Sequence, residues 1–165
     1  SHRKDYLRSG INLIQANINN IQINEAKEVI PMIDIQYTIE TEQYGNKTGN
    51  RLFIPANIFR KGFTTPDLKQ RVQDIHINYG YLDTDSICLQ IPEGYTIESL
   101  PKTCQVTSSF GSFSSSLMIK DKEICIIHRL LMHRGIYPKE IYKDFLEFRK
   151  QIAAQYSSKI ILKKE

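Results

Sequence analysis

The strongest constraint on the fold of this chain is the alternation of apolar and polar residues at every second position. The cleanest run covers residues 33–39, and a second covers residues 75–79. Successive side chains of a β-strand point to opposite faces, so a period of two predicts strands with one solvated face. The composition agrees, because 25 Ile stand against only 5 Ala, and β-branched Ile favours sheet over helix.

The period changes near the C-terminus. Pro138 suits the first turn of a helix, and apolar residues then recur at helical spacing at Ile141, Phe145, Phe148 and Ile152. We therefore expect a helix over about 138–156 that packs on the sheet, followed by a strand over 159–162.

Strands separated by turns predict a mainly β fold, an antiparallel β-sandwich-like domain with one packed C-terminal α-helix and a short N-terminal helical lead-in. The strand at 123–132 is apolar on both faces over part of its length, so we place it centrally. Residues 1–16 are interpreted as a lead-in from an upstream domain or linker, and residues 17–165 as the β domain.

Length and charge exclude several classes of protein. The chain has 165 residues and a net charge of +4, with most of the surplus after residue 138. Nucleic-acid binding needs a basic stripe with stacking aromatics, which is not found, so no nucleic-acid partner is expected. No apolar run approaches the roughly 18 residues of a membrane span. The chain begins Ser1-His2 rather than with Met, which leaves a removed export signal open.

The three cysteines, Cys88, Cys104 and Cys125, lack metal-site spacing. All three lie in apolar or alternating runs, where cysteine usually acts as a small buried apolar residue. One disulfide among them is an open alternative in an oxidising compartment, and the sequence does not say which two would pair.

We predict no catalytic residue, no metal site and no cofactor. Cys125 and His128 are three apart on one strand and so face opposite sides, and the same holds for His128 and His133, five apart. Asp83 and Asp85 can share a face, but a Ca²⁺ site needs about six oxygens, and we interpret them as solvated turn residues. The run 110–116 lacks the lysine of a phosphate loop, and Gly111 is assigned to a bend or bulge.

The remaining candidates for binding are surface aromatics. We expect Tyr81, Tyr95 and Phe63 to be exposed, with Arg60 beside Phe63 in the irregular segment 56–71. Tyr37 and Tyr79 continue runs of core Ile residues and are predicted to be buried. Exposed aromatics of this kind can dock a protein or stack on a sugar.

Four stretches carry a resemblance to a known family. They are Gly49–Asn57, Ile91–Pro101 with the turn Pro92-Glu93-Gly94, Phe110-Gly111-Ser112-Phe113, and the closing region from Tyr137-Pro138 through Tyr142, Phe145 and Phe148 to Lys159–Lys164. Over roughly residues 17–165 the chain resembles the C-terminal all-β domain of unknown function of exported bacterial proteins. In that family the domain follows an N-terminal β domain and a transglutaminase-like, cysteine-protease-like domain.

The resemblance implies a non-catalytic accessory domain in the periplasm or at the cell surface. Its expected partner is the transglutaminase-like domain of the same full-length chain, on which it would dock or whose substrate access it would shape. The alternative is a β-sandwich module that binds carbohydrate or cell-wall peptide through exposed aromatics. An enzyme is disfavoured because no nucleophile, base and orienter are matched.

Overall fold

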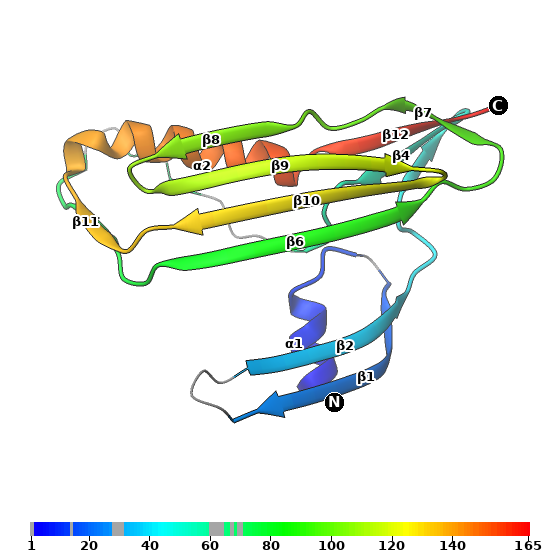
Figure 1. The fold of residues 1–165 in the computed structure, drawn as a ribbon, viewed down its shortest axis with the longest axis horizontal. Coiled ribbons are helices and arrows are strands. Elements are labelled where there is room, and N and C mark those ends of the chain that lie inside the picture. Colours follow the sequence, from blue (N-terminus) through cyan, green and yellow to red (C-terminus); the bar gives the residue numbers. More distant parts are fainter. Residues whose placement is uncertain (1, 14, 28–31, 60–64, 67, 69–70) are drawn as a thin grey trace. The chain divides into compact units, whose positions relative to one another are not determined.

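The computed structural model describes residues 2–13, 15–27, 32–59, 65–66, 68 and 71–165 (Figure 1). The chain divides into two compact units, one of residues 1–46 with 58–60, and one of residues 47–57 with 61–165. The boundary expected after residue 16 stays a prediction.

The first unit is a helix and a hairpin. The helix α1 (His2–Ser9) precedes the antiparallel strands β1 (Asn17–Ala26) and β2 (Met32–Glu40). The register shifts between Asn19 and Gln22, where Asn20 has a positive φ of 52°. Asparagine tolerates this conformation, so the shift is a β-bulge built on a residue type suited to it.

The second unit is organised around one sheet, which we call the main sheet. Its order is β6-β10-β9-β8, all antiparallel. The strands are β6 (Tyr81–Gln90), β8 (Cys104–Ser108), β9 (Gly111–Lys120) and β10 (Glu123–Met132). The prediction that 123–132 forms a central strand is confirmed, because β10 pairs with β6 on one side and with β9 on the other.

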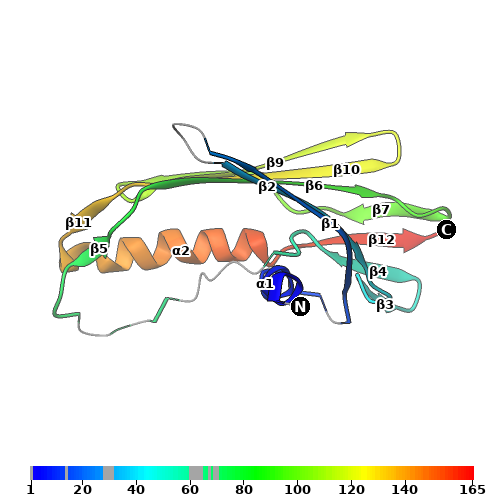
Figure 2. The ribbon, with the colours of Figure 1, turned by 90° about the horizontal axis from the view of Figure 1, so that it is seen from below.

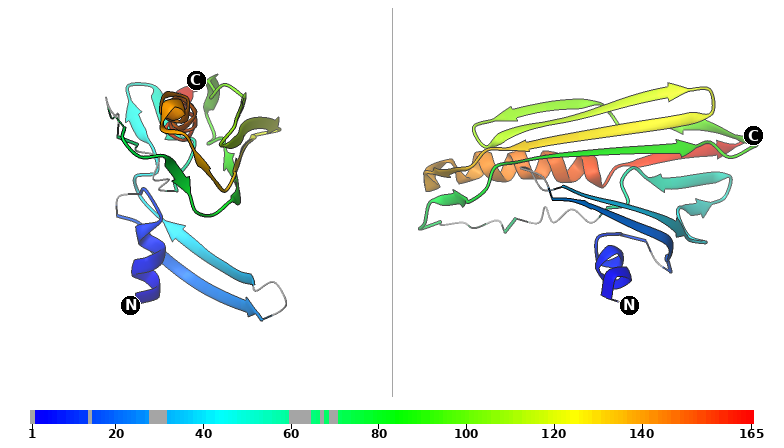
Figure 3. Two further views of the ribbon diagram at one scale, coloured as in Figure 1. Left: turned by 90° about the vertical axis from the view of Figure 1, so that its left-hand side faces the viewer. Right: turned by 60° about the horizontal axis from the view of Figure 1, so that its bottom comes forward.

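One face of the main sheet, the inner face, holds the core. A 3₁₀ turn (Lys139–Ile141) leads into α2 (Tyr142–Tyr156), which lies along this face (Figures 2 and 3). The helix buries Tyr142, Leu146, Phe148, Ile152 and Tyr156. They pack with sheet residues that include Phe110, Phe113, Leu130 and Met132. The predicted helix and its packing on the sheet are therefore confirmed.

A second antiparallel sheet has the order β3-β4-β12-β7. Its strands are β3 (Asn46–Thr48), β4 (Arg51–Pro55), β7 (Tyr95–Ser99) and β12 (Lys159–Lys164). Figure 2 shows α2 and the second sheet one after the other along the inner face of the main sheet. This arrangement agrees with the mainly antiparallel β fold with one C-terminal helix predicted from the sequence.

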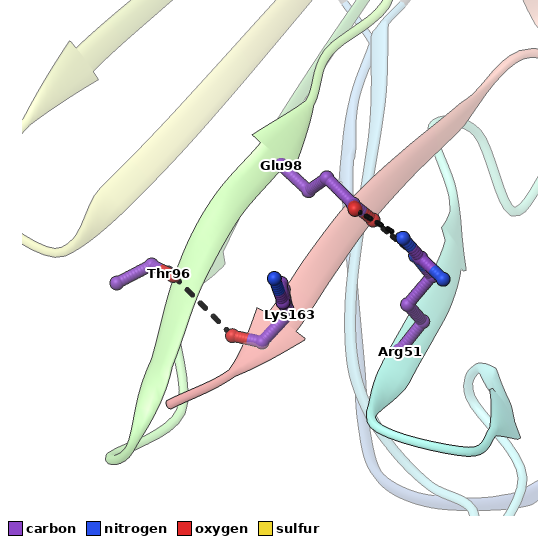
Figure 4. Close-up of polar contacts among 4 residues, drawn as sticks. All are labelled: Arg51, Thr96, Glu98 and Lys163. Carbon is purple, nitrogen blue, oxygen red and sulfur yellow. Dashed lines mark hydrogen bonds and ion pairs between the residues drawn. The ribbon is translucent and has the colours of Figure 1, made fainter.

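An ion pair crosses the second sheet (Figure 4). The Arg51 Nε of β4 lies 2.6 Å from the Glu98 Oε2 of β7, and Nη2 lies 2.7 Å from Oε1, across the intervening strand β12. The pKa of Glu98 is lowered, chiefly by the hydrogen bond from Arg51. The positive charges of Arg51 and of Lys163 on β12 lower it further.

The main sheet continues at one end into a short ladder of β5 (Ile75–Ile77) and β11 (Gly135–Tyr137). The bend between the ladders is tight at Gly80, where a Cβ would lie 3.1 Å from the Met132 carbonyl oxygen. Gly111 is tighter still, with φ +148° and room for no side chain, since a Cβ would lie 1.9 Å from the Leu131 carbonyl oxygen. The bend assigned to Gly111 therefore corresponds to a close approach of two strands.

Candidate functional site

The face of the main sheet that points away from α2, the outer face, is partly apolar. Cross-strand register places Leu82 of β6 opposite Leu131 of β10, and Cys125 of β10 between Cys88 of β6 and Met118 of β9. Leu82 is 53% exposed and Met118 58% exposed. No described element of the second unit covers this face in Figure 2. Exposed apolar side chains on a sheet face are typical of a protein-contact surface. Here Leu82 and Leu131 lie at one end of the face and Met118 lies toward the other, with mostly polar residues between them.

Cys88 and Cys125 form a disulfide on the outer face, with 4.1 Å between their Cα atoms. Cys104 is a free, half-buried thiol whose pKa is raised by burial. The pairing that the sequence left open is thus between the facing cysteines of β6 and β10. The Glu123 carboxylate lies close to both sulfurs, within 4.8 Å. Because both sulfurs are in the disulfide, no thiolate is left there to hold a metal.

The inner face carries a row of polar residues that the sequence analysis did not assemble. Asp85 of β6 stands opposite His128 of β10, which stands opposite Ser115 of β9. His128 is fully buried and Ser115 is 5% exposed. The His128 ring packs edge-on against Tyr156 at 4.8 Å and stacks on Phe113 at 5.8 Å between centroids. We call Asp85, His128, Ser115 and Tyr156 the polar row.

The electrostatics of the polar row centre on the Tyr156 hydroxyl of α2. Burial raises its pKa well above that of an ordinary tyrosine, and the carboxylates of Asp85 and Asp83 raise it further. The short-range interaction of the hydroxyl with the Asp85 side chain also raises this pKa. A neutral phenol beside a half-buried carboxylate is a potential donor to it, so the row is a polar layer inside the core.

Three of the four residue types in the polar row, aspartate, histidine and serine, also occur in serine hydrolases, where histidine activates the serine hydroxyl. In this unit Tyr156 and Phe113 pack against His128, so a substrate would have to displace core side chains to reach it. A nucleophile and base also need a site where the reacting atom can sit, and Ser115 is only 5% exposed.

Two of the four predicted binding residues, Arg60 and Phe63, lie outside the described residues. Tyr81 is 44% exposed, yet its hydroxyl is close enough to Arg149 and Tyr156 to act on the pKa of both. Tyr81 therefore belongs to the margin of the polar row. Tyr95 is half-buried at the start of β7 and pairs with Lys164 of β12. The structure does not bring Tyr81 and Tyr95 together in one site.

Two predictions from the residue pattern are wrong. Tyr79, expected in the core, is 82% exposed, because β5 ends at Ile77 and the chain then bends at Gly80. Asp83 and Asp85, expected in a solvated turn, lie within β6 and are half-buried on the inner face. Their shared orientation was predicted correctly, but their partner is Tyr156.

The described residues line at least two hollows. One lies in the first unit, is polar, and is lined by Arg8, Gln15, Asn17 and residues 40–42. The other, which we call the β5–β11 hollow, has a volume of about 410 Å³ and is lined by residues 76–79 and 134–136. Its lining combines an arginine, a histidine, an asparagine and a tyrosine with two isoleucines, and it includes no carboxylate. A spacing rule could not have found it, because its two halves are more than fifty residues apart.

No described helix has the length and apolar character needed to cross a membrane. No curated protein and no solved structure matches the chain. Residues 50–162 match a family described as a domain of unknown function with a solved structure (DUF3858). This match spans the second unit from β4 to β12. The chain therefore belongs to the DUF3858 family of domains of unknown function.

Proposed function

We propose that this chain is a non-catalytic accessory domain of an exported protein and that it docks on a transglutaminase-like domain of the same full-length chain. The outer face of the main sheet is the docking surface. The domain order of the family that the sequence resembles suggests the partner.

The exposed apolar side chains of the outer face carry this proposal. Leu82 and Leu131 face each other across β6 and β10 and form one apolar pair. Met118 of β9 lies beside the disulfide because it pairs with Cys125. Leaving such side chains in water is unfavourable by about 25 cal/mol per Å² of apolar surface, so covering them with a partner is favourable. Methionine is also enriched in protein interfaces.

The burial of the polar row supports a non-catalytic role. His128 and Ser115 are the described residues that come closest to a base and a nucleophile, and both are closed off by core side chains. In this proposal they give the core a defined packing arrangement and the chemistry resides in the partner domain.

The disulfide supports export. Structural disulfides persist in oxidising compartments such as the bacterial periplasm and are rare in the cytosol. The Cys88–Cys125 bond joins an edge strand to the central strand, as expected for a structural crosslink. A periplasmic or cell-surface location is part of the proposal.

Calorimetry of the parent protein tests the docking. Leu82→Lys combined with Met118→Lys places two charges on the outer face, at positions more than half exposed here. We expect this variant to lower the Tm of the parent or to split its transition, while the isolated chain changes little. Gln151→Lys with Ala154→Lys, on the exposed side of α2, is the matched control. An unchanged transition in the parent would contradict docking through this face.

A further inference from the structure

The β5–β11 hollow has the chemistry of a ligand site that the proposed docking does not use. It lies beyond the end of the main sheet, where the chain passes from β5 to β6 and from β10 to β11. Its volume of about 410 Å³ is within the range of small-molecule sites, about 300–1,000 Å³. Because its residues come from the second unit alone, it can be studied in this chain without a partner domain.

The side chains of the hollow are available to a ligand. Among the described residues, the side chains of His76, Asn78 and Arg134 take part in no ion pair and no hydrogen bond. Tyr79, 82% exposed, presents most of its ring to solvent. A guanidinium, an imidazole, an amide and an aromatic ring therefore belong to residues that line one small space.

The backbone that carries these groups is held in place. Gly80 lies in close contact with the backbone of Met132 and Arg134. Gly135 packs against the Tyr137 ring, since a Cβ built on this glycine would lie 3.0 Å from the ring atoms. The Tyr137 hydroxyl donates to the carbonyl oxygens of His133 and Ser109, at 3.3 and 3.4 Å. Such packing preorganises the hollow, which lowers the entropic cost of binding.

The charge of the hollow selects an anion. The guanidinium of an arginine such as Arg134 is a cation with a planar fork that matches a carboxylate in two parallel hydrogen bonds. No carboxylate lines the hollow to compete with the ligand. The nearest acidic residue along β5, Asp74, is already engaged, since its Oδ1 accepts from the Lys139 backbone N–H at 3.1 Å.

The exposed ring of Tyr79 selects what the anion is attached to. An aromatic face accepts the C–H face of a sugar ring, while the amide of Asn78 and the imidazole of His76 can hydrogen-bond hydroxyl groups. We propose that the β5–β11 hollow binds a carboxylate-bearing sugar, with the carboxylate on Arg134 and the sugar ring on Tyr79. This proposal does not depend on the docking of the outer face.

Titration of the isotope-labelled chain by NMR tests the proposal. The probes are glucuronic acid and N-acetylmuramic acid, with N-acetylglucosamine as the neutral sugar and Ala-Ala dipeptide as the carboxylate without a sugar. We expect saturable shifts of the backbone signals of 76–79 and 134–136 with the acidic sugars. The neutral sugar and the dipeptide should bind at least tenfold more weakly.

Substitutions then separate the two halves of the site. Arg134→Gln should weaken acidic-sugar binding about tenfold and bring it close to that of the neutral sugar, and Tyr79→Ala should weaken the binding of both sugars. Arg129→Gln, an exposed arginine of the outer face, and Tyr6→Ala, an exposed tyrosine of the first unit, are matched controls that should bind normally. All four positions are exposed or line a hollow, and the dispersion of the NMR signals verifies folding.

Three results would overturn the proposal. The first is that the shifted signals belong only to residues outside the hollow. The second is that neither acidic sugar saturates the shifts at sugar concentrations up to about 10 mM, at least 50-fold above the protein concentration. The third is that the dipeptide binds as tightly as the acidic sugars. Loss of docking in the parent protein would not produce any of them, since the titration uses this chain alone.

Discussion

Asp85 and His128 stand directly opposite each other on β6 and β10, on the face of the main sheet that α2 covers. The facing residues of an antiparallel pair lie close enough for their side chains to interact. Tyr156 closes this pair from the helix side, with its hydroxyl toward Asp85 and its ring against His128. The polar row thus connects sheet and helix in the middle of an otherwise apolar core.

Removal of the Tyr156 hydroxyl tests this arrangement. Tyr156→Phe keeps the ring but leaves the half-buried Asp85 carboxylate without this donor, so we expect the free energy of unfolding to fall by about 1–2 kcal/mol. Urea unfolding of the chain measures it. Tyr95→Phe, whose hydroxyl takes no part in the polar row, should change stability by less than about 0.5 kcal/mol. Equal stabilities for Tyr156→Phe and the parent sequence would show that the hydroxyl does not stabilise the core.

The raised pKa of Tyr156 also predicts an alkaline limit. Below the ordinary tyrosine pKa of about 10, the phenol is protonated in both the folded and the unfolded state. Above that pH the unfolded state loses its proton first, because folding raises the pKa of Tyr156. Stability therefore falls as pH rises beyond about 10. Tyr156→Phe should make this fall shallower, and an identical slope in both proteins would argue against the raised pKa.

Acid should act on the Arg51–Glu98 pair in the opposite sense. The pKa of Glu98 is lowered, chiefly by the hydrogen bond from Arg51, so its contribution to stability is present above the ordinary glutamate pKa of about 4.3 and is lost as pH falls through the lowered value. Carbon-detected NMR titration of the carboxyl measures this directly. Arg51→Gln should raise the pKa of Glu98 toward the ordinary value, and an unchanged titration would contradict the pairing. The pair is exposed, so the effect on stability is small.

The disulfide should contribute more than any surface pair. It closes a segment with a sequence separation of 37, for which the chain-entropy relation gives about 4 kcal/mol. Cys88→Ser combined with Cys125→Ser should therefore lower the free energy of unfolding by about 2–4 kcal/mol in urea. Cys104→Ser removes the free thiol and is the control. Reduction by dithiothreitol should lower the stability of the unsubstituted chain by as much as the double substitution does. A clearly smaller loss would show that the bond does not explain the effect of the substitutions.

Gly111 and Gly49 make a matched pair for a backbone test. Both have positive φ, but a Cβ at Gly49 meets no atom within 4 Å, whereas at Gly111 it meets the Leu131 carbonyl. Gly49→Ala should cost about 1 kcal/mol for the backbone conformation alone. Gly111→Ala should cost clearly more, about 3 kcal/mol, since β9 and β10 must separate. Equal costs, measured by thermal unfolding, would contradict the close approach.

The sequence predicts well whatever depends on local pattern. The central position of β10 follows from apolar residues on both faces over part of its length, and α2 follows from the change to helical apolar spacing after Pro138. Tyr79 shows the limit of the same rule, since the alternation continues past Ile77 where the strand itself ends.

The candidate sites depend on register and could not be predicted in this way. His128 meets Ser115 through the β9–β10 hairpin, whose turn at Asp121 has a positive φ of 53° and fixes the ladder locally. Asp85 meets His128 only because β6, far away in the sequence, adds to the other side of β10 in one particular register. The same register joins Cys88 to Cys125. No local signal in the sequence gives the pairing of distant strands.

The accessibility of residue 82 tests the docking of the outer face most directly. Leu82→Cys, in a Cys104→Ser background, places a thiol where the side chain is 53% exposed in this chain. Its rate of maleimide labelling is followed by mass spectrometry of the peptide that carries it, in the chain alone and in the full-length parent. Lys143→Cys, on the exposed side of α2, is the control and should react equally in both. Docking predicts labelling at position 82 at least tenfold slower in the parent, and equal rates in the two proteins would contradict it.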